Sequence, residues 1–381
     1  MRASEHPETL YQAFLDQTVS AGVPGITAAV AASNGVVWTA ASGIANLATG
    51  ERMRPDMLLG IGSITKTFVA VVILQLIDEK RLHPDHTAKD ILGVVVDGLP
   101  NADTATVAQL LNHTSGIPSW EDDPTWIRHG RGNLLDAGRI WGKLDTLGYI
   151  KGKKRLAAAG KKYSYSNTNY TLLGMIVEKV TGMEAVTVIH ERVLEPLGLQ
   201  DVFVEGFESV PQNRLPRRYH WATQDFRRAA GVNAAFTEVR AELIDASPSN
   251  LSTEWMAGGM LATARDLALY GLALRDGRLL KTESMEFMTD WALVGPDTQV
   301  GHGLFRISYP GGFAIVRHNG DVLGFTATLY WIEGVDAVVS MMCNVGAMHA
   351  GTVPIAINSV EKQKQFIDTV LRSKRRGSVE N

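Results

Sequence analysis

The chain has 381 residues, 45% of them hydrophobic, and a formal net charge of −3. A chain of this size and composition can bury a large core and is expected to divide into two lobes. The nearly neutral charge gives no electrostatic reason to expect a nucleic acid or an anionic membrane as a partner. No run reaches the roughly 18 apolar residues that a membrane span requires.

The first residues contain no apolar stretch of the kind that a secretory signal peptide carries. If the chain starts naturally at Met1, the protein is expected to be cytoplasmic, which argues against cell-wall and β-lactam substrates. The single cysteine, Cys343, cannot form an internal disulfide. It follows an apolar run that is typical of a buried strand, so we expect it to be an unreactive packing residue.

Hydrophobic periodicity and turn residues predict regular elements at both ends of the chain. The N-terminal end is expected to form a helix at 8–20 and strands at 26–32 and 36–42, joined by the hairpin turn Asn34-Gly35. The C-terminal end is expected to form strands at 304–309, 314–317, 326–332 and 337–342, and a last helix at about 353–372.

Strands at both ends with helical sequence between them predict an α+β fold. We expect one antiparallel sheet formed from both termini and flanked by helices, with a mostly helical lobe inserted. The sheet domain is then discontinuous, with residues 1–75 and 290–381, and the helical lobe covers 76–289. A junction between two such lobes is where pockets commonly form.

Ser63 and Lys66 form a Ser-x-x-Lys motif just before an apolar run. On a helix, residues three apart have Cβ atoms roughly 5–6 Å apart, so a nucleophile and a base would be neighbours. A serine hydroxyl needs such a base, and a lysine serves only when burial keeps it neutral. We expect Ser63 in the first turn of a buried helix, where free backbone N–H groups favour negative charge.

No single short motif in this chain is enough to identify a catalytic site. Ser-x-x-Lys recurs at 359–362, in the predicted last helix, where charged neighbours indicate solvated surface. His-x-Gly occurs at 318–320 and again at 349–351. The order of three elements in one chain carries more weight than any single match.

Ser63-x-x-Lys66, Tyr165-x-Asn167 and His318-x-Gly320 resemble, in this order, the three motifs of the penicillin-recognising serine hydrolases. This family includes class C β-lactamases, DD-peptidases, family VIII esterases and D-amino-acid amidases. The segments 112–117 and 257–260 also look like family segments, so the resemblance covers most of the chain. It implies a β-lactamase- and penicillin-binding-protein-like fold with the two-lobed architecture described above, and an active site in the cleft between the two lobes.

We predict that Ser63 is the nucleophile and Lys66 the general base for acylation. Tyr165 would pass a proton between Ser63, the leaving group and the attacking water. Because a phenol has a pKa near 10, Tyr165 would need cationic neighbours such as Lys66 and His318. Tyr163 is the rival, but it lacks an asparagine two residues later.

His318 stands where another version of the third motif has a lysine. Because the pKa of a histidine lies near neutrality, the hold on a β-lactam carboxylate is weakened and efficient β-lactamase action is not expected. Gly320 is expected to let the strand approach the substrate closely. The oxyanion hole is predicted to be the N–H groups of Ser63 and Asp321, with the carboxylate of Asp321 turned away.

Substrate binding is predicted for five residues. Asn167 would bind the acyl side of the substrate through its side-chain amide. Asn319 and Gly320 belong to the third motif, and His302 is expected to line the cleft just before a strand. Trp255 ends the segment 252–255, which looks like the D-amino-acid amidase branch.

No cofactor and no metal are expected, because no His-x-x-x-His or paired-carboxylate cluster appears. A Gly-x-Ser-x-Gly elbow and a Gly-rich phosphate loop are also missing from the sequence. His113 lies near serines, but the family pattern places it in a structural turn.

The sequence therefore predicts a serine hydrolase that acts on small amides, on short and possibly D-configured peptides, or on carboxylic esters. An acyltransferase with the same acyl-enzyme and a weak β-lactamase remain alternatives. A third alternative is a non-catalytic binding protein of the same fold. The presence of Ser63, Lys66 and Tyr165 together argues against it.

Overall fold

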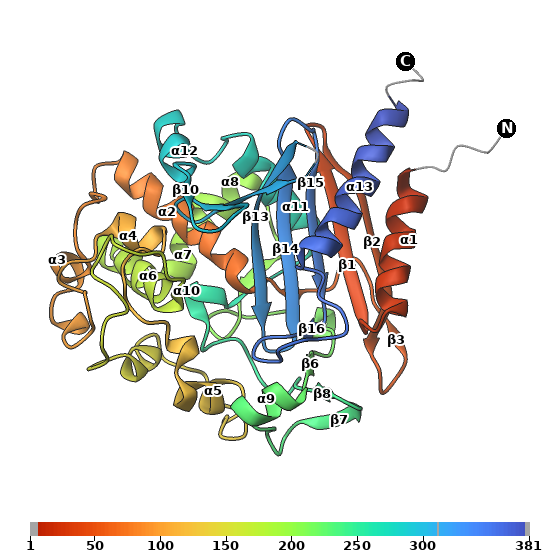
Figure 1. Cartoon of the computed structure of the whole chain (residues 1–381), viewed down its shortest axis with the longest axis horizontal. Coiled ribbons are helices and arrows are strands. Elements are labelled where there is room, and N and C mark those ends of the chain that lie inside the picture. The colour runs from red at the N-terminus through yellow and green to blue at the C-terminus, as the bar shows by residue number, and fades with distance from the viewer. Residues whose placement is uncertain (1–6, 311, 378–381) are drawn as a thin grey trace.

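The computed structural model describes residues 7–310 and 312–377. A nine-stranded sheet forms its centre, in the order β10-β11-β12-β13-β14-β15-β1-β2-β3. Strands from the two ends of the chain meet where β1 pairs antiparallel with β15, with Ile26 opposite Cys343 (Figure 1). The prediction of an α+β fold with one antiparallel sheet assembled from both termini is confirmed.

The strands of this sheet are β1 (Gly25–Ala32), β2 (Gly35–Asn46), β3 (Glu51–Arg52), β10 (Ala292–Leu293), β11 (Thr298–Val300), β12 (Phe305–Tyr309), β13 (Phe313–Val322), β14 (Phe325–Ile332) and β15 (Val338–Cys343). β13 continues beyond the predicted end at 317, because its pairing with β14 extends to Val322. The third motif, His318 to Gly320, therefore lies on a strand.

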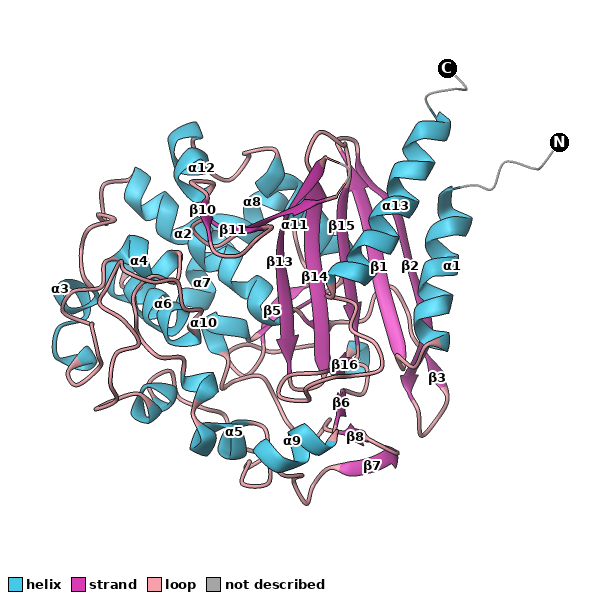
Figure 2. Cartoon of the chain, viewed as in Figure 1, coloured by secondary structure: helices cyan, strands magenta, loops and turns pink. Residues whose placement is uncertain are grey.

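Helices cover both faces of the sheet (Figure 2). Neighbouring residues on β14 show which helix lies on which face. Thr328 accepts a hydrogen bond from Gln363 of α13 (Val360–Gly377) at 2.7 Å. The next residue, Leu329, packs on the other face against Gly271 of α11 (Ala264–Arg275). α13 begins seven residues after the predicted start at 353.

α1 (Pro7–Ser20) lies beside α13, so the first and last helices cover the same face of the sheet (Figure 1). The ring of Phe366 packs on Phe14 and Tyr11, with centroids 5.0 and 5.4 Å away. α11 belongs to the segment predicted as helical lobe, yet it packs on β1 and β15. The division into 1–75 with 290–381 and 76–289 stays a prediction.

The remaining α-helices lie mostly to one side of the sheet (Figure 2). They are α2 (Thr65–Asp78), α3 (Ala88–Leu92), α4 (Val107–Leu111), α5 (Pro124–Gly130), α6 (Asn167–Thr181), α7 (Ala185–Ile189), α8 (Glu195–Leu197), α9 (Gln224–Ala229), α10 (Trp255–Gly258) and α12 (Thr282–Met288). None of the helices within 7–310 and 312–377 combines the length and apolar character needed to cross a bilayer.

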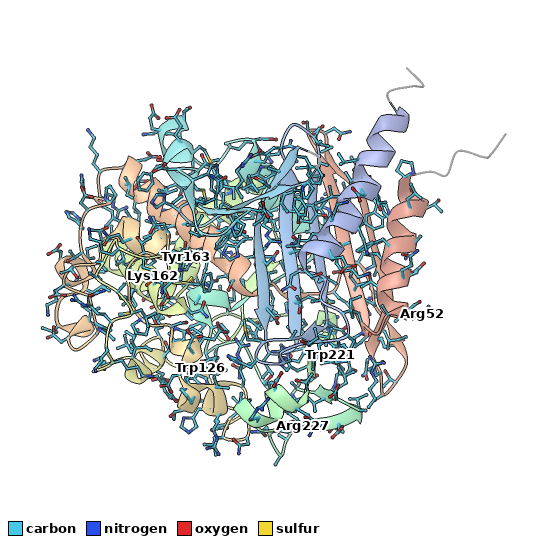
Figure 3. All side chains as sticks on the ribbon, in the orientation of Figure 1. Arg52, Trp126, Lys162, Tyr163, Trp221 and Arg227 are labelled. Carbon is cyan, nitrogen blue, oxygen red and sulfur yellow. The ribbon has the colours of Figure 1, made fainter. Side chains whose placement is uncertain are left out.

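Two small sheets complete the fold. One contains β4 (Leu59–Gly60), β9 (Met260–Ala262) and β5 (Val202–Val204). The other contains β16 (Val345–Gly346), β6 (Tyr219–Trp221), β8 (Leu243–Asp245) and β7 (Thr237–Arg240). The second small sheet lies below the large sheet, and Trp221 of β6 marks its position in Figure 3. Trp126 of α5 lies on the helical side of the molecule (Figure 3).

α2 is the central helix, and its composition explains its position. Apolar residues surround it on nearly every side, which is typical of a helix buried in the core of a large protein. The ring of Phe68 stacks on Tyr270 of α11 at 3.6 Å between centroids. This packing holds the start of α2, with Ser63 and Lys66, between the sheet and the helical side.

Candidate active site

Ser63 and Lys66 lie at the start of α2. Ser63 belongs to the short 3-10 turn Gly62–Ile64, and Lys66 is in the first turn of the helix. Lys66 Nζ is 2.8 Å from Ser63 Oγ and 2.5 Å from the carbonyl oxygen of Ala257. Burial lowers the pKa of Lys66 to about 7, although Glu121 and Glu254 act in the opposite direction. A substantial neutral fraction of this amine is therefore present at neutral pH.

Two glycines bring this turn against β13. A Cβ on Gly320 would lie 1.9 Å from the carbonyl oxygen of Ile61, and one on Gly62 would lie 2.8 Å from the backbone nitrogen of Asp321. Gly62 also has a φ of +51°, which other residues rarely adopt. Gly320 is thus required by the approach of the Ser63 turn, and the backbone of Asp321 comes close to that turn.

Gly320→Ala is expected to lower activity by roughly 10²- to 10³-fold, the typical cost of losing one oxyanion donor. The added methyl group would push the Ile61 carbonyl away and separate the N–H groups of Ser63 and Asp321. Steady-state kinetics checks this result, with thermal unfolding measured on the same samples. Gly148→Ala is the control, because a Cβ there meets no atom within 4 Å. Wild-type kinetics in Gly320→Ala would contradict this account of the turn.

Tyr165 lies beside the same two residues. Its side chain is hydrogen-bonded to Ser63, and Lys66 Nζ lies 5.0 Å from the centre of its ring. Burial raises the pKa of Tyr165 well above its usual value, so the phenol keeps its proton at neutral pH. The ring of His113 stacks on it at 4.2 Å, and His113 Nδ1 accepts the backbone N–H of Ser166. The turn at His113, with a φ of +61°, therefore supports Tyr165.

His318 is neutral in this site. Burial is the main cause, and the nearby Lys66 adds to it, so that the pKa of His318 falls to about 3. Its Nδ1 is 2.7 Å from the carbonyl oxygen of Asn319, and its Nε2 has no partner among the described residues. The expectation that His318 is a cationic neighbour of Tyr165 is wrong, whereas the protonated form of Lys66 can supply positive charge there.

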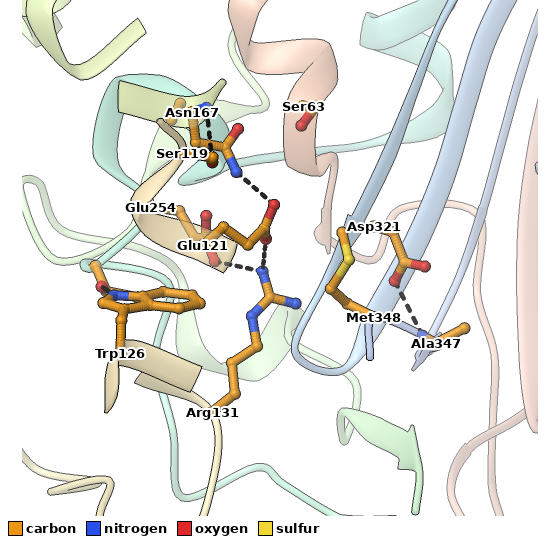
Figure 4. A network of polar contacts seen from close by, with 12 residues as sticks. Ser63, Ser119, Glu121, Trp126, Arg131, Asn167, Glu254, Asp321, Ala347 and Met348 are labelled. Atoms are coloured by element: carbon orange, nitrogen blue, oxygen red, sulfur yellow. Dashed lines mark hydrogen bonds and ion pairs between the residues drawn. The ribbon is translucent and has the colours of Figure 1, made fainter. Parts of the chain in front are cut away.

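A cavity of about 310 Å³ opens at Ser63. Six of the predicted site residues line it, namely Ser63, Tyr165, His318, Asn319, Gly320 and Asp321. The other six lining residues were not suggested by the sequence, namely Glu121, Thr298, Phe305, Arg317, Met348 and Asn358. The carboxylate of Asp321 accepts the backbone N–H of Ala347 at 2.9 Å (Figure 4), which turns it away from Ser63 as expected.

Three predicted substrate-binding residues do not line this cavity. His302 stacks on Phe287 at 4.0 Å and lies 2.7 Å from its carbonyl oxygen through Nδ1. Trp255 is buried, with its ring against the backbone of Gly174 on α6. Asn167 donates from Nδ2 to Glu121 at 2.5 Å (Figure 4). Asn167 therefore acts on the cavity through Glu121, and the assignments of Trp255 and His302 are not supported.

Asn319 lines the cavity, but its side chain is engaged elsewhere. Its Nδ2 donates to the carbonyl of Asn358 at 3.1 Å, and its Oδ1 accepts from Thr328 and Gln363. This places the amide on the face that α13 covers. Any contact of Asn319 with a substrate would therefore involve its backbone.

Two buried carboxylates share one guanidinium beside the cavity (Figure 4). Arg131 donates from Nη2 to both Glu121 and Glu254, the latter at 2.8 Å. Burial raises the pKa of Glu254 to about 7. These residues come from three separate segments, so no local motif reveals the cluster. One available signal was Glu121 itself, an acidic residue directly after the fully buried Trp120.

Comparison with known proteins gives this site a family context. The family description "Beta-lactamase" matches residues 8–358, which is most of the chain. The chain belongs to the beta-lactamase family. This confirms the resemblance to penicillin-recognising serine hydrolases that the three motifs suggested.

Relatives of this beta-lactamase-family chain include several hydrolases. It is 27% identical to esterase EstB of Burkholderia gladioli over 72% of each chain. It is 31% identical to a putative D-alanyl-D-alanine carboxypeptidase of Escherichia coli K12 over 56% of this chain, about half (51%) of that protein's length. The D-amino acid amidase of Ochrobactrum anthropi SV3, solved with L-phenylalanine amide, superposes with a TM-score of 0.82 at 25% identity. That match covers 98% of this chain and 99% of the amidase.

These relatives support hydrolase activity for this beta-lactamase-family chain. Their names cover esters, amides and peptides, so they leave the substrate open. Among residues 7–310 and 312–377, no group of three or more His, Cys, Asp or Glu side chains could hold a metal ion.

Proposed function

We propose that the protein is a serine hydrolase that forms an acyl-enzyme on Ser63 with small amides, short peptides or carboxylic esters. The observation that carries this proposal is the 2.8 Å contact between Lys66 Nζ and Ser63 Oγ, with the pKa of Lys66 lowered to about 7. A neutral amine in this place can take the hydroxyl proton as Oγ attacks a carbonyl. The carbonyl of Ala257 accepts a hydrogen bond from the same amine and holds it in position.

The remaining steps use the neighbouring groups. The N–H groups of Ser63 and Asp321 would stabilise the oxyanion of the tetrahedral intermediate. Tyr165, protonated and hydrogen-bonded to Ser63, would give a proton to the leaving group. The Ser63 proton held by Lys66 then passes to Tyr165, so that Lys66 is neutral again and can accept the proton of the water that releases the acid, with Tyr165 relaying it. This proton returns to Ser63 Oγ as the acid leaves.

The preferred acyl groups carry a free amine, as in amino-acid amides and esters. Glu121 supports this, because its carboxylate lines the cavity that contains Ser63. Glu121 and Glu254 both pair with Arg131, so this cluster has two carboxyl groups for one guanidinium. An ionised carboxylate accepts up to about four hydrogen bonds, which leaves Glu121 capacity for a substrate ammonium. The structural likeness to a D-amino acid amidase is consistent with such substrates.

Turnover of a chromogenic panel tests the proposed hydrolase directly. The panel contains p-nitrophenyl esters, D- and L-aminoacyl p-nitroanilides and nitrocefin. We expect hydrolysis of aminoacyl substrates or esters, and little hydrolysis of nitrocefin because His318 carries no positive charge at neutral pH. No turnover of any member would contradict the proposed function.

Glu121→Gln is expected to lower kcat/KM for aminoacyl p-nitroanilides by roughly 10- to 100-fold, the worth of one hydrogen bond between charged groups. The glutamine keeps the shape of the side chain and an oxygen for Asn167, but loses the negative charge. For the N-acetylated form of each substrate, which lacks the ammonium, Glu121→Gln should lower kcat/KM much less. Equal losses on both forms would show that Glu121 does not bind the amine.

A further inference from the structure

A short segment after β16 forms one wall of the cavity. We call residues 347–351 the strap. Its first two backbone N–H groups, those of Ala347 and Met348, donate to the carboxylate of Asp321 on β13. The side chain of Met348 lines the cavity. The residue whose N–H is proposed for the oxyanion hole therefore also holds the start of the strap.

The other side of the strap is tied to the segment that contains β6 and α9. His220 Nδ1 accepts the N–H of Gly324 at 3.3 Å, so its Nε2 carries the proton and donates to the carbonyl of Met348 at 3.0 Å. Thr223 donates from Oγ1 to the carbonyl of Ala350 at 2.5 Å. These bonds hold the strap between β13 and the small sheet that contains β6.

The backbone of the strap is held in an unfavourable conformation. His349 has a φ of +61°, a region that residues with side chains adopt rarely and only where the surroundings impose it. The ring of His349 donates a hydrogen bond to the backbone carbonyl of Glu121. The strap therefore joins Asp321 to Glu121, and Met348 lies between these two residues (Figure 4).

We infer that Asp321 is a positioning residue that anchors the strap and thereby places Met348 where it limits the length of the acyl group. The inference rests on the proposed function, because it concerns the acyl pocket of the same site. Met348 and Glu121 both line the cavity at Ser63, and Met348 lies between Glu121 and Asp321 (Figure 4), so we place the acyl group beside Met348. A methionine wall is flexible, so its position depends on the backbone that carries it.

The test compares p-nitrophenyl acetate with p-nitrophenyl octanoate and uses the ratio of their kcat/KM values. Met348→Ala is expected to raise the octanoate-to-acetate ratio by roughly 10- to 100-fold, in line with the worth of one or a few methylene contacts in a pocket. Asp321→Ala is expected to shift this ratio in the same direction. Asp321→Asn, which keeps an acceptor oxygen for Ala347, should restore a ratio near the wild-type value.

Three further results decide the inference. The double variant Asp321→Ala/Met348→Ala should have the same octanoate-to-acetate ratio as Met348→Ala, because both changes act through the side chain of Met348. Asp336→Ala is the matched control, since this aspartate accepts the N–H of Ser33 at 2.9 Å but does not line the cavity. Its ratio should equal that of the wild type. A uniform loss on both esters in Asp321→Ala would overturn the inference, and so would an unchanged ratio in Met348→Ala.

Hydrogen exchange gives a second readout that needs no turnover. The amides of Ala347 and Met348 are expected to exchange at least 10-fold faster in Asp321→Ala than in the wild type, with the β1 amides unchanged. If the wild-type protein hydrolyses neither ester, the proposed function is contradicted for esters. Hydrogen exchange would still test whether Asp321 anchors the strap. Unchanged exchange at these two amides would overturn the role of Asp321.

Discussion

Ser63→Ala is expected to abolish turnover, with kcat lowered by roughly 10⁴-fold or more, because removal of a covalent nucleophile disables the whole catalytic group. Intact-mass spectrometry after incubation with a fluorophosphonate checks this. The wild type should gain a single adduct, and Ser63→Ala should gain none. The hydroxyl is the group 2.8 Å from Lys66 Nζ, so the variant also removes the partner of the base.

The second Ser-x-x-Lys motif supplies the control for this experiment. Ser359 Oγ accepts the backbone N–H of Lys362 at 3.2 Å, as expected at the start of α13. Ser359→Ala should keep full labelling and full turnover. An adduct that persists in Ser63→Ala, or that forms on another residue, would contradict the assignment of Ser63 as the nucleophile.

Lys66→Met is expected to lower kcat/KM by roughly 10²- to 10⁴-fold, the usual contribution of a general base. The pH profile gives a sharper result. Because burial lowers the pKa of Lys66 to about 7, its neutral form dominates above that pH and its protonated form below it. Wild-type kcat/KM should therefore fall as the pH drops through about 7 and level off above it.

Residual activity in Lys66→Met should lack this acidic limb. Lys362→Met, in the second Ser-x-x-Lys motif, serves as the control and should keep it. The pKa values of Glu254 and Asp321 are also raised to about 7, chiefly by burial. A limb that survives in Lys66→Met would therefore assign the titration to one of these carboxyl groups and contradict the role of the lysine.

The parts of the site that sequence could predict are those with local geometry. Ser63 and Lys66 meet because residues three apart on a helix are neighbours, whatever the rest of the fold does. The strands at both ends were predictable from their apolar residues and turns. The end of β13 was not predictable, because pairing with β14 extends the strand through Gly320, and glycine disfavours strands.

The errors at the site have a common physical cause. A sequence motif says which residues are near each other along the chain, but not which cavity their side chains face. Trp255 and His302 were assigned to the substrate because of their neighbours, and both are packed against other rings or backbone. Glu121 and Arg131 were missed, because their partner Glu254 is more than a hundred residues away in sequence.

The pairing of β1 with β15 has a consequence for the biosynthesis of the protein. A ribosome releases the chain from its N-terminus, so α2 with Ser63 and Lys66 emerges long before β13. Until the C-terminal strands emerge, β1 pairs with β2 but lacks β15, and Ser63 lacks the N–H of Asp321 that would complete the proposed oxyanion hole. A nascent or C-terminally truncated chain would therefore carry the nucleophile without being able to use it, so hydrolysis would report only completed chains.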